Sequence, residues 1–273
     1  MERQIIRELT DLTYLNWSRI RNSSGTAGSF LKAYSELGGE KVYYKLSDYD
    51  GLHGVIGHES VNELIADRLL TILGIEHLHY QLIHAVVAID GRQLETWVCA
   101  SENFRRREED KQALDVYYES EKLAEESPLG FCRRMGWEEY IYQMLVIDYL
   151  ILNRDRHGAN IEVLRDKKRK TMRLAPLFDH GVSLLCRCET EEAMERFDTE
   201  ADLPVQSFVG SKSAKENLKL IPYDRRPELN PLRESDREVL MQGLDEVIPK
   251  ILQDKIWEMI WKRWNAYEAI CNS

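Results

Sequence analysis

The sequence lacks the features that mark secreted and membrane proteins. Its 273 residues include five cysteines, an odd number scattered along the chain. A disulfide framework is therefore not expected, and a reducing compartment is the natural setting for such thiols. The most apolar long segment, Met144 to Leu152, is interrupted by Asp148 and is far shorter than the roughly 20 residues that cross a bilayer. The first residues carry charge instead of the apolar stretch of a signal peptide, which predicts a cytoplasmic protein without a membrane segment.

An excess of positive charge is also missing. Lys and Arg number 37 against 47 Asp and Glu, so the net charge is −10. Proteins that coat nucleic-acid phosphates need a basic surface, and an anionic membrane surface attracts basic clusters. Direct binding to nucleic acid or to such a membrane is therefore not expected. A local basic pocket for one small anionic ligand is still compatible with this total.

The composition is that of an ordinary globular protein. Hydrophobic residues make up 43% and charged residues 31%. A chain of 273 residues can bury a sizeable core without disulfide or metal staples. At roughly 150 residues per domain, this length predicts one large domain or two lobes.

The first part of the chain carries strand signals and one strong helix signal. Residues 41–46 are rich in β-branched and aromatic side chains and predict a strand. From Ser60 to Leu73 apolar residues recur at helical spacing, and Gly74 closes the run. Strands are predicted over 82–89 and 93–99, joined as a hairpin by an Asp-Gly turn.

The pattern changes after Ser101 and becomes mostly helical. Residues 102–127 are highly charged and predict a solvated connector or surface helix. Further along, the sequence predicts a helix over 137–152, strands over 161–164 and 172–175, and a long loop over 180–232. A capping box at Ser235 and Glu238 predicts the start of a helix that ends near Pro249. A last helix is predicted through Ile256 and Tyr267. The predicted fold class is therefore α+β with two lobes: a sheet-bearing N-lobe over 1–101 and a mostly helical C-lobe over 102–273.

A polar cluster follows the apolar helix and carries the chemistry. The octet at 153–160 reads Asn-Arg-Asp-Arg-His-Gly-Ala-Asn, and Asp179 follows after the hairpin at 161–175. Phosphoryl transfer needs a carboxylate beside the attacking hydroxyl and oxygen ligands that hold magnesium against the nucleotide phosphates. Asp155 and Asn160 supply one carboxylate and one neutral ligand from a single loop, and the hairpin returns the chain so that Asp179 can face Asn160.

These residues resemble a known family. Residues 148–160 look like the catalytic loop of the HipA-like bacterial serine/threonine kinases, and residues 174–179 are similar to that family's metal-binding segment. The phosphoinositide kinases have a more distantly similar loop. The resemblance implies a two-lobed protein-kinase-like fold, with Asp155 as the catalytic base and Asn160 and Asp179 as ligands of Mg²⁺.

The N-terminal part fits the same resemblance. Lys45 stands where a kinase keeps the lysine that grips the nucleotide phosphates, and Glu63, which follows Asn62, stands where its ion-pair partner is found. The segment from Cys99 to Ser101 would be the hinge that contacts adenine. A loop of small residues with many backbone donors precedes Lys45 and is suited to hold phosphates; it comprises Ser23, Ser24, Gly25, Thr26, Ala27, Gly28 and Ser29.

Three further features are interpreted structurally. Asp148 lies inside an apolar helix, where a carboxylate needs partners, and we expect it to orient the catalytic loop or another side chain. His157 is expected to shape the same loop by hydrogen bonds rather than to transfer protons. His77 with His79, and the Cys186 and Cys188 pair with His180, lack the paired spacing of structural zinc sites, so the sequence gives no reason to predict zinc there.

The resemblance thus implies an ATP- and Mg²⁺-dependent kinase that acts on Ser or Thr of a protein substrate. It also implies self-phosphorylation of the small-residue loop and a regulator of the antitoxin type as partner. The residues alone leave two alternatives open: a nucleotide-binding regulatory module of the pseudokinase type without transferase activity, and a kinase that acts on a small molecule or lipid. Presence of Lys45, Asp155, Asn160 and Asp179 together favours an active enzyme.

Overall fold

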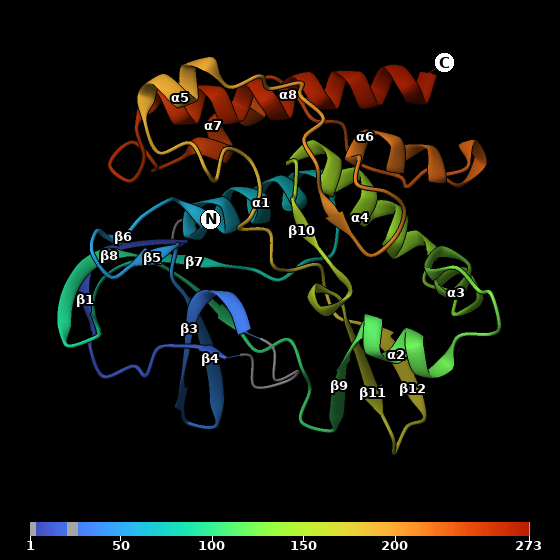
Figure 1. The fold of residues 1–273 in the computed structure, drawn as a ribbon, viewed down its shortest axis with the longest axis horizontal. Coiled ribbons are helices and arrows are strands. Elements are labelled where there is room, and N and C mark those ends of the chain that lie inside the picture. Colours follow the sequence, from blue (N-terminus) through green and yellow to red (C-terminus); the bar gives the residue numbers. More distant parts are fainter. Residues whose placement is uncertain (1–3, 21–26, 273) are drawn as a thin grey trace.

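The computed structural model describes residues 4–20 and 27–272. Over these residues the chain forms a sheet-rich N-terminal region and a mostly helical C-terminal part, which confirms the predicted α+β class (Figure 1). In Figure 1 the N-terminal strands lie on the left and the C-terminal helices cross the top. The lobe boundary predicted between residues 101 and 102 falls at the end of a strand, β8 (Arg92–Glu102), and stays a prediction.

A six-stranded sheet forms the N-terminal region. Its strand order is β1-β7-β8-β4-β3-β2, with β1 parallel to β7 and the other pairs antiparallel. The other strands of this sheet are β1 (Ile5–Leu12), β2 (Ser18–Ile20), β3 (Ala27–Leu37), β4 (Glu40–Lys45) and β7 (Gln81–Ile89). β4 corresponds to the strand predicted over 41–46. A small separate hairpin is formed by β5 (Tyr49–Asp50) and β6 (Gly54–Val55).

The hairpin of β7 and β8 follows directly from its turn sequence. Asp90 and Gly91 both have positive φ, +50° and +76°. A two-residue turn with positive φ at both positions matches the twist of the strands that it joins, and Asp-Gly is one of the few pairs that adopt it readily. Ile89 and Arg92 are opposed at the hairpin end.

Helix α1 (Glu59–Leu73) connects the two parts of the molecule. It agrees with the predicted helix, and Gly74 ends it at φ +77° with its N–H bonded to the carbonyls of Leu70 and Thr71. Its apolar side chains belong to the same hydrophobic core as the C-terminal helices. Arg68 adds hydrogen bonds of 2.8 and 2.9 Å to the carbonyls of Leu240 and Gln242. Groups on α1 are thereby held in place by both lobes.

The C-terminal part is built around two long helices. α4 (Glu138–Leu150) and α8 (Lys250–Asn272) confirm the helices predicted at 137–152 and around Ile256. A three-stranded sheet with the order β12-β11-β9 packs against α2 and carries the two strands predicted after the catalytic loop. The remaining elements are β9 (Glu109–Ala113), α2 (Leu114–Glu121), α3 (Pro128–Arg134), β10 (Asp155–Arg156), η1 (Gly158–Asn160), β11 (Glu162–Asp166), β12 (Thr171–Leu174), α5 (Glu191–Arg196), β13 (Gln206–Ser207), α6 (Ala214–Asn217), η2 (Leu218–Leu220), η3 (Tyr223–Arg225) and α7 (Asp236–Met241).

Three local predictions were wrong in whole or in part. The segment 102–127, predicted as a solvated connector or surface helix, does contain the helix α2. It also contains the strand β9, which its polar sequence does not indicate and which forms by pairing with β11. The predicted loop at 180–232 contains short helices and contributes side chains to the core, Leu185 and Val209 among them. The predicted capping box at Ser235 is not formed, since the Ser235 side chain caps nothing and α7 ends at Met241, before Pro249.

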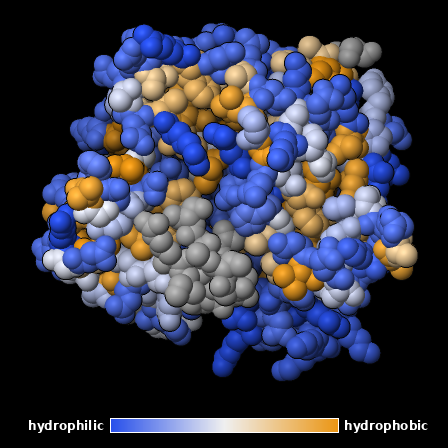
Figure 2. Space-filling view, in the orientation of Figure 1, coloured by the Kyte–Doolittle hydropathy of each residue, from blue (hydrophilic) through white to orange (hydrophobic). Residues whose placement is uncertain are grey.

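The hydrophilic character of the surface agrees with the large share of charged residues in the sequence. Figure 2 shows a face dominated by hydrophilic residues, with hydrophobic ones distributed among them. No helix in the described part of the chain combines the length and the apolar character that crossing a membrane requires.

Candidate active site

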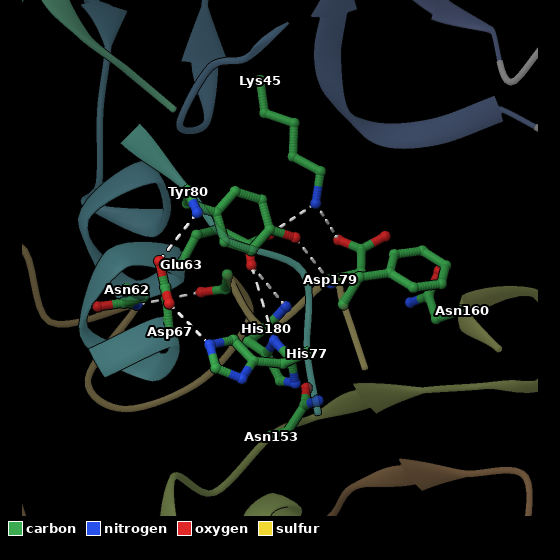
Figure 3. A network of polar contacts seen from close by, with 12 residues as sticks. Lys45, Asn62, Glu63, Asp67, His77, Tyr80, Asn153, Asn160, Asp179 and His180 are labelled. Carbon is green, nitrogen blue, oxygen red and sulfur yellow. Dashed lines mark hydrogen bonds and ion pairs between the residues drawn. The ribbon is translucent and has the colours of Figure 1, made fainter. Parts of the chain in front are cut away.

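Lys45 forms the centre of the site at the end of β4. Its Nζ lies 2.6 Å from Oε1 of Glu63 in α1 and 2.7 Å from Oδ1 of Asp179, which follows β12 (Figure 3). Burial by itself would lower the pKa of Lys45, but the Asp179 and Glu63 carboxylates outweigh it and raise the pKa well above its usual range. The lysine therefore stays a cation. The predicted pair of Lys45 and Glu63 is present, and Asp179 joins it.

The turn at Asp179 is fixed by contacts from the N-terminal region. Asp179 has φ +62°, a conformation that an ordinary side chain adopts only when its surroundings enforce it. Its N–H donates to the Tyr80 hydroxyl at 3.3 Å, and the next N–H, of His180, donates to Oε2 of Glu63 at 2.9 Å. The Asn62 side-chain amide donates to the carbonyls of Gly181 and Ser183. These bonds hold the Asp179 carboxylate beside Lys45 before any ligand is present.

A buried ion pair supports the catalytic loop. The guanidinium of Arg156 contacts both carboxylate oxygens of Asp148 in α4 at 3.0–3.2 Å, and Asn153 donates to the same carboxylate at 2.9 Å. Asp148 thus orients the side chains of Arg156 and Asn153 and, through them, the loop, so the partners that its position in an apolar helix predicted are present. Burial would lower the pKa of Arg156, but the Asp148 charge raises it above the ordinary value. No local pattern in the sequence indicates this role of Arg156.

Arg156 also brings the two halves of the site together. Its Nη1 donates to the carbonyl of Phe178 at 2.7 Å and lies 3.4 Å from the carbonyl of Asn160. Phe178 directly precedes Asp179, so this guanidinium links the backbone at Asn160 to the turn at Asp179. That the Asn160 and Asp179 side chains together hold a metal stays a prediction. Carboxylate and amide oxygens are the ligand types that Mg²⁺ takes, so the donor set fits that ion.

Asp155 lies on the same loop with its carboxylate partly open to solvent. Its side chain is 23% exposed, and His157 Nε2 is 3.6 Å from its Oδ1. The loop is stabilised through the Asp155 backbone: its N–H donates to the Asn153 side chain at 3.2 Å, and its carbonyl accepts from the Asn160 amide at 2.7 Å. Pairing of β10 with β13 adds further support. A partly open carboxylate on a rigid backbone is the arrangement that a base for an incoming hydroxyl needs.

A second lysine and two aromatic rings adjoin the site without having been predicted. Lys32 is the cross-strand partner of Lys45, and its Nζ lies 3.6 Å from Oδ2 of Asp179. Each oxygen of the Asp179 carboxylate therefore faces a different ammonium group. Phe104 and Phe178 are in ring contact at 5.4 Å, between the connection after β8 and the segment before Asp179. Only tertiary pairing places these residues here, so a single sequence gives no signal for them.

The remaining predicted residues are placed less completely. Ser23, Ser24, Gly25 and Thr26 lie outside the described residues, while Ala27 and Gly28 begin β3. Cys99 is paired with β7 and β4 and its side chain is buried, which raises the pKa of its thiol well above the usual range. Among the described strands, Ser101 pairs with β4 only, opposite Tyr43. From Ser101 onward, β8 is therefore paired with a described strand on one side only. Contact between its backbone and adenine stays a prediction.

Comparison with known proteins decides the fold. No protein-family model and no curated protein matches the sequence. The crystal structure of CtkA, a proinflammatory kinase of Helicobacter pylori, superposes with a TM-score of 0.63 and 17% identity, over 93% of each chain. This chain has the fold of a kinase. HipA of Shewanella oneidensis, solved with HipB and operator DNA, matches with a TM-score of 0.39 and 16% identity, over 93% of this chain and 59% of HipA. The match to CtkA thus confirms the kinase-like fold that the sequence resemblance implies.

Proposed function

We propose that this chain is an ATP- and Mg²⁺-dependent phosphotransferase that acts on Ser or Thr of a protein substrate in the cytoplasm. The observation that carries the proposal is the ion-pair network of Lys45, Glu63 and Asp179 beside the Asp155–Asn160 loop. A kinase fold with these groups in contact has the parts that phosphoryl transfer needs. An antitoxin-type regulator and self-phosphorylation belong to the proposal through the sequence resemblance.

The roles of the residues follow from their charges and places. Asp155 accepts or orients the proton of the attacking hydroxyl, because its carboxylate is the partly open one. Lys45 binds the nucleotide phosphates while Glu63 keeps its ammonium group in position. Asn160 and Asp179 hold Mg²⁺, which supplies charge neutralisation at the phosphates when bound. Lys32 adds a second cation toward the same phosphates. Most of the rate enhancement comes from positioning and from fixed charges.

The decisive test is incubation of the chain with labelled ATP and Mg²⁺ in the presence of candidate cell extracts, followed by mass spectrometry. We expect phosphate on protein Ser or Thr, including a site between Arg21 and Phe30 of the chain itself. Nucleotide binding without any transfer would show a pseudokinase instead. Transfer only to a small molecule or lipid would overturn the protein substrate but leave the phosphotransferase.

Removal of the Asp179 carboxylate should lower the Mg²⁺-dependent affinity for ATP more than removal of the Lys45 ammonium group does. In the Asp179→Ala variant the Mg²⁺-dependent part of ATP affinity should be lost, because a charged oxygen ligand of a hard cation has gone. Lys45→Ala should retain part of it, since Lys45 is one of several groups at the phosphates. Calorimetric titration with ATP, with and without Mg²⁺, measures both. Equal metal-dependent affinity in the Asp179 variant and the wild type would disprove the assignment.

Tyr80 should act as a positioning residue for Asp179. Tyr80→Phe removes the acceptor of the Asp179 N–H and keeps the buried ring. A lost hydrogen bond of about 1 kcal/mol corresponds to a roughly fivefold change. We therefore expect the Mg²⁺ concentration for half-maximal activity to rise about fivefold with little change in thermal stability. Tyr223→Phe, at an exposed hydroxyl, is the matched control. An unchanged Mg²⁺ dependence would show that Tyr80 only fills space.

A further inference from the structure

A second polar cluster lies where α1 meets the segment before β7. Asp67 of α1 has a fully buried side chain, and its Oδ1 is 2.7 Å from Nε2 of His77 and 3.0 Å from Nδ1 of His79. Asp67 and His77 are labelled in Figure 3. One ligand atom from each of the three residues lies within 4.8 Å of the other two. The proposed phosphoryl transfer uses none of these side chains.

The hydrogen bonds of His77 indicate which of its ring nitrogens carries a hydrogen. Its Nδ1 lies 2.6 Å from the carbonyl oxygen of Ile75, which can only accept, so Nδ1 carries a hydrogen. A neutral ring with its hydrogen on Nδ1 directs a lone pair from Nε2 toward Oδ1 of Asp67, which is also an acceptor. Two acceptors do not attract each other at 2.7 Å, so either a proton or a metal cation lies between them.

The surroundings of the cluster favour a metal. The side chain of His79 is 74% exposed, yet its ring turns to the same oxygen of Asp67 instead of to water. Oδ2 of Asp67 accepts from the Tyr80 N–H at 2.8 Å and from Gln4 at 3.3 Å, which leaves Oδ1 for the two imidazoles. An imidazole that binds a metal usually donates its other N–H to a carbonyl or carboxylate, as His77 does.

We propose that Asp67, His77 and His79 bind one divalent transition-metal cation of the zinc type. Two imidazoles and one carboxylate are a known zinc ligand set that leaves a fourth position for water. Bonds of about 2.0–2.1 Å in tetrahedral geometry separate neighbouring ligand atoms by about 3.3 Å. The 2.7 Å distance from Asp67 Oδ1 to His77 Nε2 therefore has to widen by about 0.6 Å, and the 3.0 Å distance to His79 Nδ1 by about 0.3 Å. The exposed side of His79 provides the route of entry.

The bound cation would join α1 to the segment that carries Tyr80. Glu63 lies on the same helix as Asp67, and Tyr80 directly follows His79. Occupancy of the cluster therefore stabilises the two elements that hold Lys45 and Asp179. Spacing along the sequence did not indicate the site, because the third ligand comes from α1, well before the two histidines.

The test uses the full chain without nucleotide, so its outcome is independent of phosphotransferase activity. We expect Zn²⁺ to bind with a stoichiometry of one in competition with a chromophoric chelator. Co²⁺ should bind without the thiolate charge-transfer band that the five cysteines would produce. Zn²⁺ should raise the Tm of the wild type by several degrees.

His79→Ala is the informative variant, because an exposed ring can be removed without disturbing the core. It should weaken Zn²⁺ binding by at least about tenfold and abolish the Tm shift. His53→Ala, at another exposed histidine, should behave as the wild type. Absence of stoichiometric binding, or equal binding by His79→Ala and the wild type, would overturn the proposal and leave a buried imidazolium–carboxylate pair only.

Discussion

Replacement of Asp155 by Asn should lower the rate of phosphoryl transfer by about 10²- to 10⁴-fold, the range that a positioned general base contributes. The fold and the affinity for ATP should be nearly unchanged. The substitution preserves side-chain volume, and the contacts of Asp155 that stabilise the loop come from its backbone N–H and carbonyl. Only the charge that handles the proton of the hydroxyl is removed.

The measurement is single-turnover transfer from labelled ATP, together with ATP affinity and thermal stability of the same preparation. Asp224→Asn, at an exposed acid away from the site, is the matched control and should transfer phosphate at the wild-type rate. Wild-type turnover in Asp155→Asn would show that Asp155 is not the base. If the affinity for ATP fell by the same factor as the rate, Asp155 would be assigned to ATP binding instead of catalysis.

Replacement of Arg156 by Ala should have the largest effect on stability. The guanidinium is 1% exposed and is paired with Asp148, whose side chain is 9% exposed. Without Arg156 a buried carboxylate keeps only the Asn153 amide, and the Phe178 carbonyl loses its donor. Removal of one partner of a buried pair costs about 3–5 kcal/mol, because the remaining charge stays buried. Arg156→Lys should cost less, since it keeps the charge and loses only the bidentate geometry.

Urea denaturation of the variants measures this difference. Arg196→Ala removes one partner of a solvent-exposed pair with Glu192, and it should leave the unfolding midpoint nearly unchanged. If Arg156→Ala also left the midpoint unchanged, the pair with Asp148 would contribute nothing to the fold. A normal midpoint with lost activity would assign Arg156 to placement of Asn160 and Asp179 alone.

The elements that could be predicted are those whose signals are local. The Asp90-Gly91 turn, the α1 helix that ends at Gly74 and the long α8 helix each depend on residues close together in the sequence, so their backbone preferences suffice. β9 could not be predicted, because a charged segment becomes a strand only through its ladder with β11. The segment at 180–232 has no periodicity of its own and is ordered by burial of single side chains in the common core.

The residues of the candidate site also fall into two groups, those that local sequence indicates and those that only tertiary contacts bring together. The sequence by itself determined where the candidates Asp155, Asn160 and Asp179 stand, since one octet and a following hairpin carry their residue types and spacing. The pair of Lys45 and Glu63 was implied by the family resemblance, and the structure contains it. Tertiary structure alone decided that Arg156 bridges the loop to the Asp179 turn, that Tyr80 holds that turn, and that Lys32 joins Lys45. It also decided that Asp67 meets His77 and His79. The physical reason is that hydrogen bonds and ion pairs between residues far apart in sequence form only when packing brings their elements together, and no local preference encodes that meeting.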